Sequence, residues 1–222
     1  GTIENGSGSN TTALTKVGPS MLTLAGTSSF TGATTISGGT LLLTGSFSGT
    51  SAVNINSGGT LGGTGSVTSA ATVTLASGAI LAPGLGLGNG VLTLPNLTWT
   101  AGGNLTVGVI DGTSSDTIDL GSGALTASGT GNFDISFDGA TLDAPGTYTI
   151  ISYGSETGFV AGNFTATDVT INPAYIGAFN ITTSGPGSLT FDVTAVPEPA
   201  VYGLALGGVA LLLGLRRRRQ VA

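Results

Sequence analysis

A spacing of twenty residues runs through the first part of this chain. A glycine recurs at that interval four times in succession, and a large apolar residue follows each glycine after three positions. A glycine-rich composition alone does not explain four successive matches at the same spacing. A fixed period of this length is typical of solenoids, in which each repeat is one unit that stacks on the next. The glycines are Gly18, Gly38, Gly58 and Gly78, and the apolar residues are Met21, Leu41, Leu61 and Leu81.

Within each repeat the hydrophobic pattern has a period of two. The stretches AVNIN (52–56) and ATVTL (71–75) alternate apolar and polar residues and are rich in β-branched side chains, which indicates strands. Short strands in a fixed period predict an all-β fold, a parallel β-helix in which each coil pairs its backbone with the neighbouring coils. The columns expected to face inward pair Val53 with Val73, Ile55 with Leu75, and Phe47 with Val67.

The repeat weakens after LAPGLGLGNG (81–90), but the three-residue offset returns at Gly102 and Leu105, after one longer step from Gly78 and Leu81. We therefore expect β-helix repeats over residues 1–110. Residues 111–194 hold nine of the eleven acidic residues and alternate again, so we expect a β-rich end that caps the open edge of the solenoid. Residues 195–222 form a third segment of different character.

Composition narrows the chemistry that this chain can perform. It has no histidine and no cysteine, which excludes Ser-His-Asp and Cys-His catalysis, disulfides and the usual zinc ligands. Charged residues make up 7% of the chain against 40% hydrophobic residues, the reverse of a disordered composition. Lys16 is the only basic residue before Arg216, so no surface for nucleic acid is expected. No cofactor and no metal are expected either.

The thirty residues LTKVGPSMLTLAGTSSFTGATTISGGTLLL (14–43) resemble the autotransporter-associated β-strand repeat. The resemblance consists of a lysine and a glycine at the start, a Leu-Thr-Leu strand, an aromatic-Thr-Gly corner at Phe30, and a Thr-Thr-Ile strand before Gly-Gly-Thr-Leu. It implies a right-handed parallel β-helix in a surface or secreted protein.

The last segment, VPEPAVYGLALGGVALLLGLRRRR (196–219), joins an apolar run to a basic cluster. Sixteen uncharged residues from 200 to 215 reach about 24 Å as a helix, somewhat short of a bilayer core of roughly 30 Å. Arginines at one end can extend toward the headgroups, so a single transmembrane helix is expected with its basic end in the cytoplasm. The helix residues are Ala200, Leu204, Leu206, Val209, Leu211, Leu212, Leu213 and Leu215, and the basic cluster is Arg216, Arg217, Arg218 and Arg219.

Three interpretations of this segment are open: a buried core helix with a solvated basic tail, an ordinary tail anchor, and a sorting signal. Val196, Pro197, Glu198 and Pro199, followed by the apolar run and the arginines, are similar to the PEP-CTERM sorting signal of exported bacterial proteins. The resemblance implies export, at least transient anchoring in the inner membrane, and cleavage by an exosortase-type membrane protease. Because the chain begins at Gly1 without an apolar leader, we also expect a mature form or a fragment.

Two groups of aspartates are the remaining candidates for chemistry. Their oxygens suit calcium, but the spacing matches neither the EF-hand loop nor a glycine-rich nonapeptide repeat, so solvated turns are favoured. Paired carboxylates on a β-helix could also serve a polysaccharide hydrolase, although Lys16 is the only cation before the tail that could hold an acidic sugar. The aspartates are Asp111, Asp116 and Asp119 in the first group, and Asp134, Asp138 and Asp143 in the second.

These observations predict an exported structural protein of the cell surface or extracellular matrix that is not an enzyme. Its expected partners are an exosortase, the inner membrane and exopolysaccharide. A carbohydrate-binding or adhesive module is the first alternative, in which Trp99, Tyr148 or Tyr153 would stack on sugar rings, although core packing is favoured for all three. A polysaccharide hydrolase that uses Asp134 or Asp138 is the second alternative.

Overall fold

The fold is known from a computed structural model, which describes residues 2–49, 51–68, 72–85, 89–109, 114–138, 141–142 and 144–196. Within these ranges the regular structure consists of strands and one short 3-10 turn, η1 (Ala161–Asn163), with no α-helix. No helix of the described ranges is long and apolar enough to cross a membrane. The predicted transmembrane helix (200–215) lies outside the described residues.

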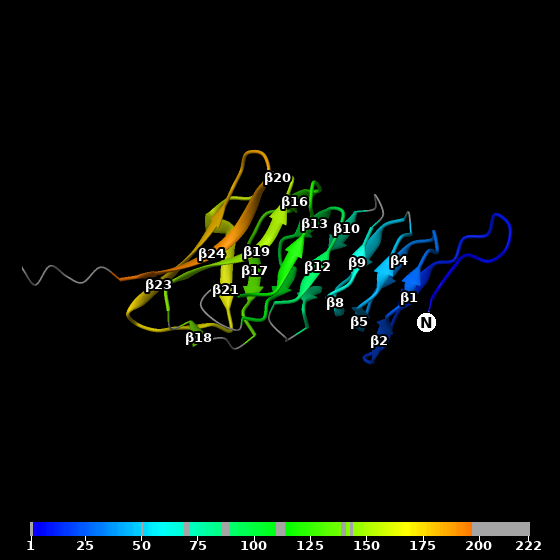
Figure 1. The fold of residues 1–222 in the computed structure, drawn as a ribbon, viewed down its shortest axis with the longest axis horizontal. Helices are drawn as coiled ribbons and strands as arrows, with labels where there is room; N and C mark the ends of the chain where they lie inside the picture. The colour runs from blue at the N-terminus through cyan, green and yellow to red at the C-terminus, as the bar shows by residue number, and fades with distance from the viewer. Residues whose placement is uncertain are drawn as a thin grey trace, which may run out of the picture.

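Three sheets run along the molecule, and each coil of the chain contributes one strand to each sheet in turn (Figure 1). Sheet A consists of β1 (Leu14–Lys16), β4 (Thr34–Ile36), β7 (Val53–Ile55), β10 (Val73–Leu75), β13 (Leu97–Thr100), β16 (Ala124–Ser128) and β20 (Ser155–Thr157). Sheet B consists of β2 (Met21–Leu24), β5 (Gly39–Leu43), β8 (Gly59–Gly63), β11 (Ile80–Pro83), β14 (Asn104–Thr106), β17 (Phe133–Ser136) and β21 (Phe164–Thr167). Sheet C consists of β3 (Thr27–Ser28), β6 (Ser46–Phe47), β9 (Ser66–Val67), β12 (Val91–Thr93), β15 (Thr117–Asp119), β19 (Gly146–Tyr153), β24 (Gly187–Ala195) and β23 (Tyr175–Ile181).

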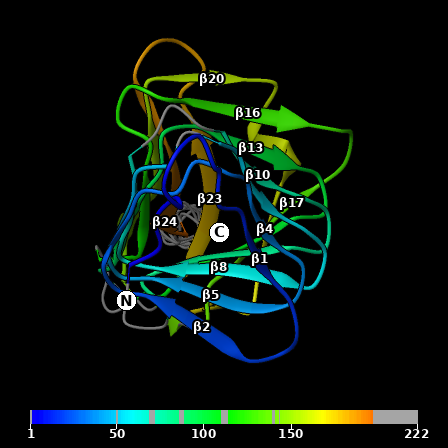
Figure 2. The same ribbon diagram turned by 90° about the vertical axis from the view of Figure 1, so that its right-hand side faces the viewer.

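The pairing between successive coils is parallel in sheets A and B from end to end, and in sheet C as far as β19. Figure 2 looks along the stack from its N-terminal end, and the chain turns clockwise as it recedes from the viewer, which is the right-handed sense. The prediction of a parallel β-helix is therefore confirmed for the described part of the chain. We use the word coil for one passage of the chain through the three sheets.

The predicted inward columns are confirmed in register. Val53 pairs with Val73, and Ile55 pairs with Leu75, in sheet A; Phe47 pairs with Val67 in sheet C. All six side chains are buried, because alternate residues of each strand face the interior of the coil. The longer step predicted after Leu81 is also correct, since Leu81 pairs with Leu105 in sheet B.

The position of Met21 in this scheme was predicted wrongly. Met21 pairs with Thr40, and it is Leu22 that pairs with Leu41 and continues the inward column. Met21 is 59% exposed. The reason is that the corner between sheets A and B differs in length between the first two coils. Ile36 and Leu41 are one residue closer in sequence than Lys16 and Leu22, with which they pair, so the twenty-residue spacing shifts by one.

The corner between sheets A and B is closed by a turn with a glycine at positive φ. In three successive coils this residue is Gly58, Gly78 or Gly102, with φ between 73° and 80°. The N–H of Gly58 donates to the carbonyl of Gly78 (2.9 Å), and that of Gly78 donates to Gly102 (2.8 Å), so the corner glycines also join the coils. In the second coil the residue with positive φ is Gly39, not Gly38.

The coils lengthen along the stack. In sheet A, Leu14 pairs with Thr34 near the N-terminal end, whereas Leu125 pairs with Glu156 near the other end, which is a much longer step along the sequence. The extra residues lie between strands, and β18 (Thr141–Leu142) and β22 (Thr170–Ile171) form a small additional parallel pair there. Residues of the stretch 111–194 therefore contribute strands to the same three sheets; the division of the chain at 110 and 194 stays a prediction.

The C-terminal end of the stack is closed by strands that reverse direction. β24 runs antiparallel to β19, and β23 runs antiparallel to β24. Figure 2 shows β23 and β24 across the middle of the cross-section, behind the coils. Phe179 of β23 packs against Phe191 of β24 and against Phe164 of β21, with ring centroids 4.7 Å and 5.6 Å apart respectively.

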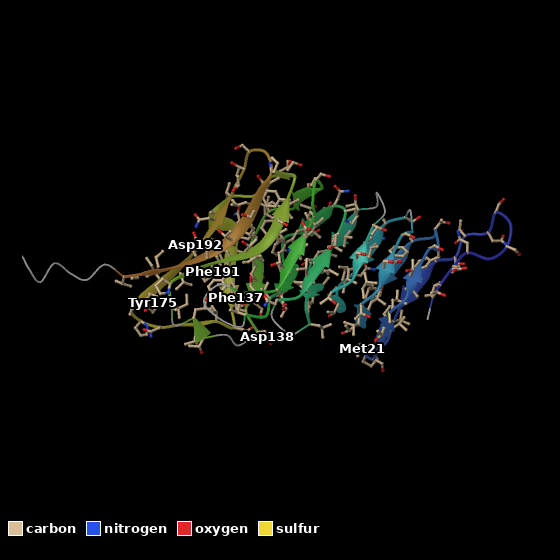
Figure 3. The ribbon with its side chains drawn as sticks, in the orientation of Figure 1. Met21, Phe137, Asp138, Tyr175, Phe191 and Asp192 are labelled. Atoms are coloured by element: carbon tan, nitrogen blue, oxygen red, sulfur yellow. The ribbon has the colours of Figure 1, made fainter. Side chains whose placement is uncertain are left out.

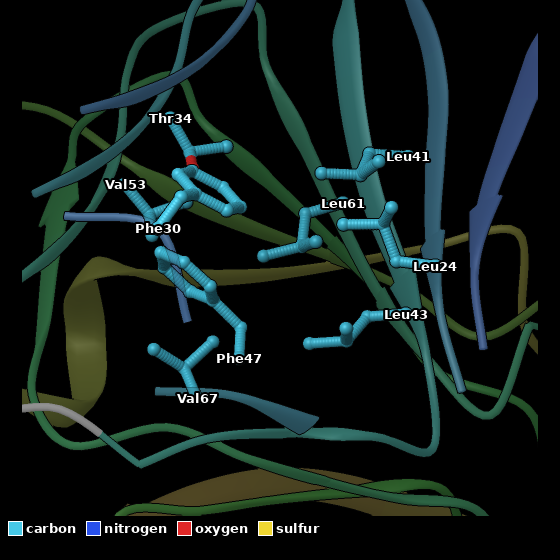
Figure 4. Close-up of a pocket in the computed structure, with 9 residues that line it drawn as sticks. All are labelled: Leu24, Phe30, Thr34, Leu41, Leu43, Phe47, Val53, Leu61 and Val67. Carbon is cyan, nitrogen blue, oxygen red and sulfur yellow. The ribbon is translucent and has the colours of Figure 1, made fainter. Parts of the chain in front are cut away.

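A small apolar cavity lies inside the first three coils (Figure 4). Apart from Thr34, its lining is made of apolar side chains. The hydroxyl of Thr34 is directed into this apolar space, and its Oγ1 is buried without a hydrogen-bond partner. The residues that line the cavity are Leu24, Phe30, Thr34, Leu41, Leu43, Phe47, Val53, Leu61 and Val67.

Replacing Thr34 by valine is expected to stabilise the protein by about 1 kcal/mol. Valine has the same shape, removes the buried hydroxyl that lacks a partner, and continues the column that contains Val53 and Val73. The control is Thr35→Val on the same strand, where the side chain faces outward and a change within about 0.5 kcal/mol is expected. Denaturant unfolding measures both variants, and an equal effect at the two positions would contradict this assignment.

Candidate functional surface

A row of hydroxyl and amide side chains runs the length of sheet A on its outer face. In β4, β7 and β10 the middle residue points outward because its two neighbours face the interior, and the residues paired with it in the other strands continue the row. Successive members are directly paired, so neighbouring members lie about 4.8 Å apart. We call this row the sheet A ladder; its members are Thr15, Thr35, Asn54, Thr74, Thr98, Thr126 and Thr157.

The surface beside the ladder is small and polar. Ala33 and Ala52 precede the ladder residues of their coils by two positions, and Ser37 and Asn56 follow them by two. These four residues are exposed, and the Asn56 amide Nδ2 donates to Ser37 Oγ (3.1 Å) between coils. Such a face offers hydrogen-bond donors and acceptors at regular intervals and carries no charge between Lys16 and Asp111. It suits an extended uncharged contact.

Lys16 lies on β1, the strand at the N-terminal end of sheet A. It faces inward in register with Ile36, and it is only 6% exposed. Its ammonium Nζ donates to three backbone carbonyls, those of Val17 (3.0 Å), Gly18 (2.8 Å) and Gly38 (2.8 Å). The lysine therefore joins the corners of the first two coils. Sequence reasoning missed this role, although the alternation of Leu14, Thr15 and Lys16 places the lysine on the inner face.

Replacing Lys16 by methionine is expected to lower the free energy of unfolding by about 2 kcal/mol. Methionine retains much of the apolar stem but loses three hydrogen bonds from a charged donor, each of which contributes about 1.5–3 kcal/mol. It also removes the desolvation cost of the buried ammonium, which offsets part of that loss. Since the three partners are neutral carbonyls, the loss should be the same at low and high salt. A loss that disappears in high salt would show instead that Lys16 acts through an ion pair.

The two described aspartates of the first group, Asp116 and Asp119, have separate hydrogen-bond partners. Asp116 is fully buried, and its two carboxylate oxygens accept hydrogen bonds from the N–H groups of Gly90 (2.7 Å) and Gly108 (2.9 Å). Asp119 accepts from the N–H of Gly121 (2.9 Å) and from Ser152 Oγ (2.8 Å). Both carboxylates thus fix loops and neighbouring coils. The burial of Asp116 was not foreseen, because the register of the sequence had already slipped before it.

The two described aspartates of the second group, Asp134 and Asp138, also lie in different surroundings. Asp134 lies on β17 between Asn104 and Thr165 of the adjacent strands and faces outward, whereas Asp138 is exposed beyond the end of that strand. Figure 3 places Asp138 at the edge of the stack, away from Asp192. In the described part of the chain no three acidic residues are grouped so that they could hold a metal ion. Asp111 and Asp143 lie outside the described residues.

The three aromatic residues considered for sugar stacking are all in the core. Trp99 is 0% exposed, Tyr148 1% and Tyr153 2%, which confirms core packing for each of them. The indole Nε1 of Trp99 donates to the carbonyl of Gly103 (3.0 Å), and the Tyr153 hydroxyl donates to the carbonyl of Thr182 (2.7 Å). Burial raises the pKa of Tyr153. None of these rings presents a face to a ligand on the surface.

The predicted sorting segment begins where the stack ends. Val196 is the last described residue, is 41% exposed, and donates its N–H to the carbonyl of Ala174 (2.8 Å). The chain therefore leaves the fold beside the beginning of β23. The remaining residues of the predicted motif, helix and arginine cluster (197–219) lie outside the described residues, and the sorting signal stays a prediction.

Comparison with known families supports the repeat. Residues 14–43 match the model of a family described as the passenger-associated transport repeat. The matched residues form the first coil and the first two strands of the second, β4 and β5. No curated protein matches the chain. This part of the chain is thus similar to the repeats of autotransporter passengers, and the similarity indicates a surface-exposed protein.

Proposed function

We propose that this protein is an exported structural rod of the cell surface or extracellular matrix and that it has no catalytic role. One observation carries the proposal: a passenger-type repeat opens a stack that continues in register for seven coils. Each coil satisfies the backbone hydrogen bonds of the next, and large apolar columns fill the interior. A long, uncharged, hydroxyl-lined body of this kind fits a scaffold or a contact surface.

The sorting route is the finer part of this proposal. The Val-Pro-Glu-Pro motif, the apolar run and the arginines support transient anchoring in the inner membrane and cleavage by an exosortase. Val196, the first residue of this motif, is 41% exposed at the end of the fold, where a protease can reach it.

The test of the sorting route is the intact mass of the protein recovered from the outside of its native producer. A mass that ends between residues 196 and 199 supports processing of the segment. A mass that retains Arg216 to Arg219 contradicts processing and means a permanent anchor. Protein found in the cytoplasm with its tail intact contradicts export itself.

A second candidate function is an adhesive module for a neutral exopolysaccharide. The sheet A ladder favours it, because its hydroxyl and amide groups form a long uncharged row. Binding to a glycan array should be lost in Thr74→Lys, at the centre of the ladder, and retained in Thr60→Lys, which lies on the outer face of sheet B. Equal binding by both variants contradicts a contact through sheet A. The variant Trp99→Ala does not test this idea, because Trp99 is buried.

The absence of catalysis is tested separately. If the protein is a polysaccharide hydrolase, reducing sugar is released from exopolysaccharide, and Asp134→Asn or Asp138→Asn abolishes the release. We expect no release from the unaltered protein above a heat-denatured control. Activity that depends on either aspartate would replace the structural proposal by an enzymatic one.

A further inference from the structure

Strand β23 (Tyr175–Ile181) is the outermost strand of sheet C and lies one level beyond the coils, at the left end of the molecule in Figure 1. It pairs with β24 on one side, and no described residue pairs with its other edge. It has seven residues, whereas the other terminal strands of sheets A, B and C have at most four. This edge is thus the longest one that the described fold leaves open.

The backbone groups on the open edge can be identified from the hydrogen bonds on the paired side. Val196 N–H donates to the carbonyl of Ala174 (2.8 Å), and Thr182 N–H donates to the carbonyl of Ser188 (3.2 Å). In an antiparallel pair the residues that bond to the partner alternate along the strand, so the even-numbered residues of β23 bond to β24. The N–H and C=O groups of the odd-numbered residues from 177 to 181 therefore point to the open edge.

The sequence of β23, YIGAFNI, contains none of the features that protect an edge strand. Natural edges are kept from pairing by charged side chains, proline, bulges or short length. This strand has no charge and no proline, and its pairing with β24 is regular over all seven residues. Ile176 is 55% exposed, and Phe179 is only partly covered by the core. Such an edge is suited to accept another strand.

We infer that the open edge of β23 pairs antiparallel with the same edge of a second copy, about a two-fold axis at Phe179. Antiparallel pairing of a strand with itself closes on two copies and leaves no free edge at the contact. Centring on Phe179 joins odd-numbered residues to odd-numbered residues, as their free N–H and C=O groups require. Across the axis the facing residues are Gly177 with Ile181, Ala178 with Asn180, and Ile176 with Thr182.

Charge does not oppose this contact. Asp192 lies on β24 opposite Ala178, and its Oδ2 accepts from Asn180 Nδ2 (2.7 Å). In the dimer the two Asp192 side chains are separated by three strand spacings, about 14 Å. That distance exceeds the screening length of about 8 Å at physiological ionic strength, so their repulsion is weak. Figure 3 shows Tyr175 and Asp192 at this end of the rod, with Met21 at the other.

The first experiment measures association of the full chain by sedimentation velocity. One added strand pair is a small interface, so we expect a monomer–dimer equilibrium with a dissociation constant on the order of 100 µM. Ile181→Pro removes an N–H on the open edge and should abolish the dimer, whereas Ile181→Ala shortens the same side chain, keeps the N–H, and should still dimerise. Circular dichroism is the control that checks whether both variants fold. A monomer at all concentrations, or equal association of both variants, overturns the proposal.

The second experiment tests the register and does not depend on the proline variant. The chain has no cysteine, so introduced thiols are the only ones present. Ala178 of one copy faces Asn180 of the other, at a spacing that permits a disulfide. Ala178→Cys with Asn180→Cys in one chain should give a covalent dimer on mild oxidation, and each single variant should not. Crosslinking that is equally efficient in the single variants, or its absence in the double variant, contradicts this register.

Discussion

Gly63→Ala is expected to destabilise the protein by about 4 kcal/mol, because it combines a strained backbone conformation with a steric clash. Gly63 ends β8 with φ at +116°, a conformation that side chains rarely adopt. A Cβ at this position would also collide with the carbonyl oxygen of Leu43 in the preceding coil. Because that oxygen belongs to backbone, neither coil can yield without breaking the pairing between β5 and β8.

Three further glycine variants separate the effect of positive φ from the effect of the steric clash. Gly45→Ala adds a Cβ against the backbone of Gly26 without positive φ, so contact alone should cost about 2 kcal/mol. Gly18 has φ at +74° and open space around it, so conformation alone should cost about 1 kcal/mol. Gly162 has neither feature and should be neutral within about 0.5 kcal/mol. Denaturant unfolding of the four variants should give this order; equal losses at Gly63 and Gly162 would contradict close stacking at the corner.

Trp99→Ala is expected to cost about 4 kcal/mol. The indole is fully buried between Leu75 and Ala127 in the same column, and the small alanine on one side leaves it room. Its ring lies 5.4 Å from that of Phe133 and 6.1 Å from that of Phe164. Removing it leaves a cavity at the junction of the regular coils and the aromatic cluster, where the surrounding backbone is fixed by pairing on both sides.

Trp99→Phe should cost less, about 1.5 kcal/mol, because it keeps a ring and loses the hydrogen bond to Gly103. Val160→Ala serves as the control, since Val160 is 58% exposed and a change within about 0.5 kcal/mol is expected there. Trp99 is the only tryptophan, so unfolding must be followed by circular dichroism and not by fluorescence. A loss below about 1 kcal/mol for Trp99→Ala would contradict the assignment of this ring to the core.

Where the period is regular, the sequence was sufficient to predict the fold. Val53 with Val73 and Leu61 with Leu81 are paired as their spacing implies, because a period of two fixes which residues face inward and corners of equal length keep the count. Met21 shows the limit of this reasoning. The corner of the second coil is one residue shorter than that of the first, which moves Met21 from the predicted inward column to the surface. Met21 and Leu22 are both apolar, so their residue types do not reveal which of them faces inward.

The later coils were harder to predict for a related reason. Residues added between strands, as in the step from Leu125 to Glu156, remove the fixed period on which the argument depends. The reversal of direction in β23 and β24 depends on tertiary packing against Phe164, which no local pattern records. The roles of Lys16 and Asp116 are contacts with backbone of other coils, and these become visible only once the coils are in register.

The measurement that tests the stack most directly is a set of distances between spin labels on the sheet A ladder. Cysteines at Thr15 and at one of Thr98, Thr126 or Thr157 accept labels specifically, because the chain has no other thiol. The labelled positions lie four, five and six coils apart. A continuous parallel stack predicts narrow distributions at about 19, 24 and 29 Å, with about 4.8 Å more for each coil, whatever the number of residues between the labels. Distances that follow sequence separation, or distributions too broad to differ, would contradict a continuous parallel stack.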